Sequence, residues 1–163
     1  KELDTVIYFE ALSEVSVRVS HDLFISKEMI PFDTDAVDRA INSFLSKDYI
    51  RIREIDSFLI FPNVGYEWNE YLLESFLLSY SKKFALVNNG LSLNNVAGFV
   101  VKKSGQINDF IDACAAFLAD GRIELKKVDA LNYLADMNVI SRRSYKDIDL
   151  ALRRAAQIRR RKE

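Results

Sequence analysis

The residues with the clearest chemical character lie at the C-terminal end, in the stretch SRRSYKDIDLALRRAAQIRRRKE. Residues 122–163 hold twelve Lys and Arg against six Asp and Glu, a net charge of +6, whereas residues 1–121 carry a net charge of −7. An arginine-rich helix can follow the phosphates of a nucleic acid, because each neutralised phosphate releases condensed counterions. The cations predicted to reach phosphates from this end are Arg142, Arg143, Arg153, Arg154, Arg160, Arg161 and Lys162.

Three other uses of these cations stay open. Cations in the last turn of a helix complement its dipole, and basic tails are often simply solvated. The basic end could also pair with the acidic remainder of the chain, within one molecule or between two copies. A basic amphipathic helix can lie on a membrane, but here its apolar face is mostly alanine, so we predict no membrane partner.

Candidate catalytic residues are few. His21 stands between Ser20 and Asp22, but members of a catalytic triad come from separate elements, so we interpret it as a structural or surface residue. Cys114 falls on the apolar side of its segment and is predicted to be a core residue. The five glycines form no phosphate-binding loop, and no metal-ligand spacing occurs. The sequence therefore predicts a non-enzymatic chain without a cofactor.

The composition predicts a folded domain. The chain has 163 residues, of which 49% are hydrophobic, with 11 Phe and 7 Tyr but only five Gly and two Pro. These aromatic side chains supply a sizeable core at this length. A single cysteine excludes an internal disulfide and fits a reducing compartment, so we expect a cytoplasmic protein.

The first part of the chain has a recognisable order of elements. Apolar spacing predicts a helix over 4–19, and a second helix begins after Asp33 or Thr34 as its N-cap. Apolar residues then alternate over 49–52 and 58–60, which predicts a two-stranded hairpin with its turn at 54–57. Between the two helices lie a short apolar run at 23–25 and a helical turn at 27–30.

This order, over residues 4–63, resembles a winged helix. In that family the second helix meets DNA, and the hairpin forms a wing that touches the backbone. Carboxylates at the start of the second helix would repel phosphates, so the resemblance implies a protein-docking role for that helix and phosphate contact for Arg51 and Arg53 of the wing. The predicted docking residues are Asp33, Asp35, Asp38, Arg39 and Asn42.

The remainder of the chain is predicted to be helical. The segment 66–84 is apolar around much of its circumference, as expected of a buried helix that joins two halves. Apolar stripes predict further helices over 92–101, 107–120, 123–140 and 144–161. The expected fold is mainly α, with a winged-helix-like lobe at 1–65 and a helical lobe at 66–163.

We therefore predict an interaction module of a larger nucleic-acid-handling assembly. The acidic lobe would dock on a partner protein, and the basic C-terminal helix would contact nucleic acid without sequence specificity. Two alternatives are a pure protein–protein scaffold and an auxiliary helical domain of an enzyme whose active site lies outside this sequence.

Overall fold

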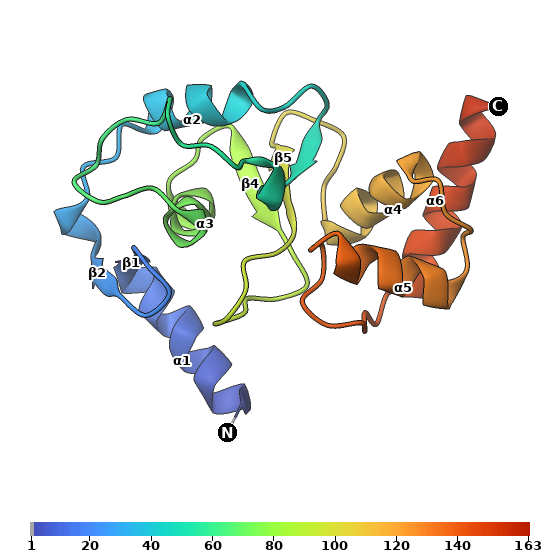
Figure 1. Ribbon diagram of the computed structural model, residues 1–163, viewed down its shortest axis with the longest axis horizontal. Helices are drawn as coiled ribbons and strands as arrows, with labels where there is room; N and C mark the ends of the chain where they lie inside the picture. Colours follow the sequence, from blue (N-terminus) through green and yellow to red (C-terminus); the bar gives the residue numbers. More distant parts are fainter. Residues whose placement is uncertain (1) are drawn as a thin grey trace.

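A computed structural model describes residues 2–163, with side chains from residue 7 onward. The described residues are mainly helical, as predicted, and also form two small antiparallel sheets (Figure 1). The elements in chain order are α1 (Glu2–Val15), β1 (Ser16–Arg18), β2 (Phe24–Ser26), the 3₁₀ turn η1 (Lys27–Met29), α2 (Thr34–Asn42), β3 (Tyr49–Arg51), the 3₁₀ turn η2 (Ile52–Glu54), α3 (Glu70–Ser79), β4 (Phe84–Val87), β5 (Phe99–Lys102), α4 (Phe110–Asp120), α5 (Lys127–Asp136) and α6 (Ile148–Lys162).

Strand β5 is the centre of the larger sheet. The strand order is β3-β5-β4, and both neighbours pair with β5 in the antiparallel sense. Tyr49 of β3 lies opposite Val101, and Phe84 of β4 lies opposite Lys102. The smaller sheet is the hairpin of β1 and β2, with Val17 opposite Ile25.

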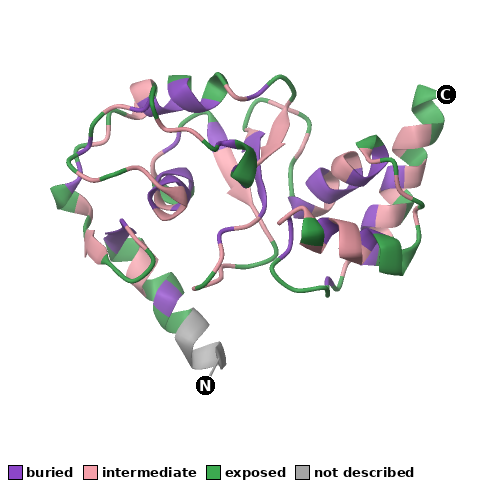
Figure 2. Ribbon diagram, in the orientation of Figure 1, coloured by how far each residue is buried: buried purple, intermediate pink, exposed green. Residues whose placement is uncertain are grey.

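Successive side chains of β5 enter different cores, because neighbours on a strand point to opposite faces of the sheet. Val100 packs with α2 and α3, whereas Phe99 and Val101 pack with α4, α5 and α6. Figure 1 shows the sheet between these two groups of helices, and Figure 2 shows buried residues along α3 and β5. A third cluster, which contains Val17 and Leu72, joins the β1–β2 hairpin to α3.

Helices α2, α3 and α4 each begin at a residue whose side chain caps the helix. Asp33 accepts a hydrogen bond from the amide of Ala36 at the start of α2, as predicted. Asn69 and Asp109 cap α3 and α4 in the same way, each accepting from amides of the first turn. Gly121 follows the end of α4 as predicted, but its φ of −71° is not left-handed.

The predicted hairpin over 49–60 is wrong. Tyr49–Arg51 does form a strand, but it pairs with β5, and the chain continues into η2 rather than into a hairpin turn. Phe58 is not in a strand; its ring packs against Phe61 and Trp68. The apolar residues of this segment do not share one buried face, because Ile52 is buried whereas Ile60 is 59% exposed.

The predicted helix over 92–101 is wrong, and the predicted helix over 4–19 is shorter than expected. The spacing of Val96, Val100 and Val101 fits a helix, but residues 99–102 form β5. The first helix stops at Val15, and the next three residues form β1 instead of extending the helix to residue 19. The predicted buried helix over 66–84 is confirmed as the shorter α3, whose Leu72, Leu73, Phe76 and Leu77 are buried.

No helix among the described residues is long and apolar enough to cross a membrane.

The backbone at Gly98, just before β5, lies very close to the backbone at Val87, the last residue of β4. Its φ is +115°, and an added Cβ would lie 2.4 Å from the carbonyl oxygen of Val87. We expect Gly98→Ala to lower the free energy of unfolding by about 3 kcal/mol, because backbone strain and a steric clash add. Urea denaturation measures this change. Gly90, with φ +95° and open space around an added Cβ, is the control, and equal losses for the two alanine variants would contradict the clash.

Candidate functional site

The predicted docking helix presents one outward face. Asp35, Arg39 and Asn42 are exposed and follow the i, i+4, i+7 spacing of a single side of α2. Asp35 forms an exposed ion pair with Lys82, with 3.5 Å between its Oδ1 and Nζ. Asp33 is exposed but serves as the N-cap of α2. Three of the predicted docking residues are therefore placed to meet a partner.

Asp38 corrects the docking prediction. Only 1% of it is exposed, so it cannot reach a partner in this fold. Its carboxylate accepts hydrogen bonds from the Ser81 hydroxyl and from the amides of Lys82 and Lys83, the latter two at 3.0 and 3.2 Å. Asp38 therefore holds the turn between α3 and β4 against α2.

Several cations of the basic end are engaged inside the molecule. The Arg154 guanidinium donates to Asp112 of α4 at 2.6 Å. The Lys162 ammonium lies 2.6 Å from Asp120, at the other end of α4. These two predicted phosphate contacts instead hold α6 against α4.

Arg159 has the most extensive internal role on α6. Its guanidinium donates to the carbonyl oxygens of Leu118, Ala119, Gly121 and Ile123, at 2.6 to 3.1 Å. The last carbonyls of a helix have no partner within the helix, and cations favour that end of its dipole. Arg159 therefore caps the C-terminus of α4.

Asp120 connects three elements through one carboxylate. It accepts from Lys162 of α6, from Lys47, and from the Tyr49 hydroxyl of β3 at 2.7 Å. Burial alone would raise the pKa of Asp120, but the hydrogen bonds from Lys162, Lys47 and Tyr49 outweigh it and hold the pKa well below its usual range. Burial, together with the hydrogen bond to Asp120, raises the pKa of the Tyr49 hydroxyl.

The two arginines assigned to the predicted wing lie elsewhere. The Arg51 side chain is only 20% exposed, donates to the Met137 carbonyl at 3.1 Å and binds Glu54. Arg53 is more exposed, and it contacts Asn95 at 3.1 Å and Glu70 at 3.8 Å. Arg51 therefore joins β3 to the end of α5, and no wing among the described residues carries either arginine toward a nucleic acid.

The remaining cations of the basic end face outward. Arg153, Arg160 and Arg161 are exposed on α6, and none of them has an ion-pair partner among the described residues. Arg142 and Arg143 are exposed in the segment before α6, and Arg143 binds Asp136 at 3.0 Å. Residues 160–163, at the end of α6, are all exposed (Figure 2).

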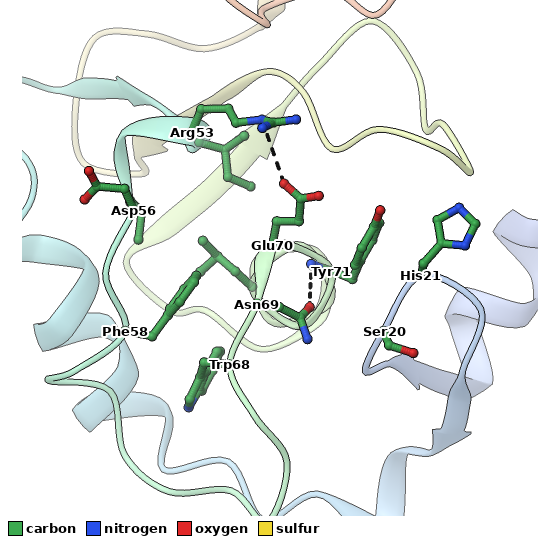
Figure 3. Close-up of a pocket in the computed structure, with 12 residues that line it drawn as sticks. Ser20, His21, Arg53, Asp56, Phe58, Trp68, Asn69, Glu70 and Tyr71 are labelled. Atoms are coloured by element: carbon green, nitrogen blue, oxygen red, sulfur yellow. Dashed lines mark hydrogen bonds and ion pairs between the residues drawn. The ribbon is translucent and has the colours of Figure 1, made fainter.

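A pocket of about 520 Å³ at the start of α3 was not predicted. Figure 3 shows Phe58 and Trp68 on one side, His21 on the other, and the Arg53–Glu70 pair between them. Two of its polar groups have partners within the fold: the Trp68 indole donates to the Pro62 carbonyl, and the Asn69 side chain caps α3. The aromatic run from residue 58 to 71 is the signal that could have located it.

Two buried ionisable side chains, Arg18 and Glu74, lie where the β1–β2 hairpin meets α3. Arg18 is 2% exposed, and its guanidinium lies over the rings of Tyr71, Phe9 and Phe24, at 4.3 to 5.7 Å from their centroids. Glu74 is also 2% exposed, and burial raises its pKa to about 7 despite the positive charge of Arg18. The neighbouring Glu70 contributes to the same rise in pKa.

The His21 ring forms its hydrogen bond away from Ser20 and Asp22. His21 contacts Asn94, with 3.3 Å between Nε2 and Oδ1, while Ser20 donates to Asp22. Cys114 is fully buried, as predicted, and burial raises the pKa of its thiol. Among the described residues, no group of three His, Cys, Asp or Glu side chains is placed to hold a metal ion. Neither Ser20 nor Cys114 forms a hydrogen bond with His21 in the described part of the chain.

Comparison with known proteins gives no match to this chain among protein-family models, curated proteins or solved structures. The function is therefore inferred from the sequence and the structure.

The hydrogen bonds of the Asp38 carboxylate should contribute measurably to the stability of the fold. We expect Asp38→Ala to lower the free energy of unfolding by about 3 kcal/mol, because three buried donors lose their acceptor. Asp35→Ala, which removes only an exposed ion pair, should change it by less than about 1 kcal/mol. Urea denaturation compares the two variants, and similar losses would show that the network around Asp38 is not decisive.

Glu74 should give the protein a measurable pH dependence. Between pH 4.5 and about 7 the folded protein keeps a proton on Glu74 that the unfolded chain has lost, so stability falls as pH rises through this window. Glu74→Gln should remove that slope, up to about 3 kcal/mol over the window. Unfolding free energies measured at several pH values test this, with the exposed Glu67→Gln as the control. Parallel curves for wild type and Glu74→Gln would contradict the shift.

Proposed function

We propose that this chain is a non-enzymatic interaction module of a nucleic-acid-handling assembly. It contacts nucleic acid through the outward cations of α6 and docks on a partner protein through the exposed face of α2. The supporting observation is that Arg153, Arg160 and Arg161 stay exposed, without an ion-pair partner in the described part of the chain, after the neighbouring cations have been used inside the fold.

The outward cations follow one side of α6. Arg153, Gln157 and Arg160 are separated by four and three residues, so their side chains lie in one row about 10 Å long. Ala151 and Ala155 on the opposite side are fully buried against α4 and α5, which fixes the row toward solvent. This row is the phosphate-facing surface of the proposal.

Such a surface binds without reading sequence. Arginines that contact phosphates position a protein on the strand, whereas specificity requires contacts with base edges. The expected signature is an affinity that falls steeply with salt, with a slope near −0.9 for each phosphate neutralised on duplex DNA.

The protein-docking part of the proposal concerns the acidic portion of the chain. Residues 1–121 carry a net charge of −7, and the exposed face of α2 combines Asp35, Arg39 and Asn42. The acidic balance of residues 1–121 disfavours phosphates, and the mixed charges of this face suit a partner protein with complementary charges. The winged-helix resemblance over 4–63 stays a prediction, now without the hairpin over 49–60.

A pure protein–protein scaffold is the second candidate. Leu59 is 94% exposed and Ile60 is 59% exposed, directly after Phe58 of the pocket at the start of α3. Neighbouring exposed apolar side chains beside an aromatic pocket are typical of a protein contact surface. This candidate requires no nucleic-acid contact, so a binding measurement separates the two.

Charge reversal on α6 tests the proposed function. The double variant Arg153→Glu/Arg160→Glu should lose nucleic-acid binding by at least about a hundredfold at about 50 mM salt, because attraction at two positions becomes repulsion. Fluorescence anisotropy with labelled duplex DNA, single-stranded DNA and RNA, at about 50 and about 200 mM salt, measures the change.

The matched control is Arg39→Glu/Lys82→Glu, which changes the net charge equally at exposed positions on and beside α2. The control variant should bind nucleic acid with an affinity within a few fold of that of the wild-type chain. Unchanged binding by the α6 variant, with its circular dichroism intact, would overturn the nucleic-acid role and leave the scaffold candidate.

A further inference from the structure

A second cationic feature lies near the start of α6. A hollow of about 550 Å³ is lined by Asn89, Lys127, Leu131, Arg143, Ser144, Tyr145 and Lys146. Three of these side chains are cations and none is a carboxylate. Lys127 begins α5, whereas Arg143 and Lys146 belong to the connection between α5 and α6, so segments from different parts of the fold bring the three charges together.

The three cations are available to an anion from solvent. Lys146 is exposed and has no ion-pair partner among the described residues. Lys127 and Arg143 bind Asp149 and Asp136, but these pairs lie at the surface, with both members between 59% and 70% exposed. Exposed ion pairs contribute little to stability, so exchanging a carboxylate for a phosphate at either position costs little.

Polar groups beside the cations suit a phosphate as well. Ser144 carries a hydroxyl and Asn89 an amide, and the Asn89 amide donates to the Ser144 carbonyl at 3.4 Å, which ties the loop after β4 to the connection before α6. Phosphate oxygens accept charge-assisted hydrogen bonds from arginine and lysine, and neutral donors add to them.

The hollow is continuous with the outward row of α6. Lys127 contacts Asp149, with 3.6 Å between its Nζ and Oδ2. Arg153 is four residues beyond Asp149, so it occupies the next position on the same side of the helix. The cations Lys127, Arg153 and Arg160 therefore lie along about 16 Å of α6, with the carboxylate of Asp149 between Lys127 and Arg153.

We infer that this hollow binds a backbone phosphate of a nucleic-acid strand that continues along the outward row of α6. The inference rests on the proposed function, because it identifies a further part of the same nucleic-acid surface. Arg143 and Lys146 hold the phosphate, and Lys127 links it to the row.

The test is the double variant Arg143→Gln/Lys146→Gln in the full chain, titrated with labelled duplex DNA and with single-stranded RNA. We expect about tenfold weaker binding at about 50 mM salt and a salt slope smaller in magnitude by about one to two. Lys82→Gln/Lys83→Gln, with the same change in net charge at two exposed positions, is the control and should retain the wild-type slope. Circular dichroism verifies folding of each variant.

Amide chemical shifts give a second readout. A short oligonucleotide should perturb the amides of Lys127 and of residues 143–146 together with those of the outward row. Perturbation confined to α6, or a wild-type salt slope in Arg143→Gln/Lys146→Gln, would overturn the hollow as a site.

The outcomes separate this inference from the proposed function. Loss only in Arg153→Glu/Arg160→Glu would support the proposed function and overturn the hollow. Loss only in Arg143→Gln/Lys146→Gln would support the hollow and overturn the α6 row as the main surface. No binding by the wild-type chain to any of the nucleic acids would overturn both.

Discussion

The pairing of β5 with two antiparallel neighbours is the constraint on which the rest of the fold depends. This strand of four residues hydrogen-bonds β3 on one side and β4 on the other, and its side chains divide between two cores. The helices on both sides therefore pack against the same short strand. Val100 is fully buried among α2 and α3, and Phe99 is fully buried among the C-terminal helices, so neither core is complete without β5.

Ion pairs and hydrogen bonds from charged side chains hold the C-terminal helices together in addition to their apolar packing. Arg159 caps α4, Arg154 binds Asp112, and Asp120 joins α4 to α6 and β3. The positive charge that a binding partner could contact is therefore smaller than the net charge of residues 122–163. A basic end with a net charge of +6 presents one row of arginines on α6 and one cationic hollow, and the proposed nucleic-acid binding depends on these two features.

Local signals in the sequence predicted much of the helical structure but not the larger sheet. The capped start of α2 and the end of α4 at Gly121 depend on neighbouring residues, so the sequence predicts them well. Strand β3 pairs with a segment far along the chain, and no local pattern identifies that partner. The alternation of apolar residues after Tyr49 therefore fitted a hairpin that does not form, and the spacing of Val96, Val100 and Val101 fitted a helix as well as a strand.

In the candidate site, too, features set by neighbouring residues could be predicted, whereas features set by distant residues could not. The exposure of Arg153, Arg160 and Arg161 follows from helical spacing opposite the apolar side and could be predicted. The burial of Asp38 could not, because its donors belong to the turn between α3 and β4, far along the chain. Likewise, Lys127 and Lys146 give no sign of forming one hollow until α5 and its connection to α6 are folded.

The position of β5 also bears on the order in which the chain folds. The β4–β5 pair is closed by residues 88–98 alone, whereas β3 must return across η2, α3 and β4 to reach the other edge of β5. Closing a short loop loses less chain entropy than closing a long one. We therefore expect β4 and β5 to pair early and β3 to join last, so that the two cores become complete in a single late step rather than as independently folding halves.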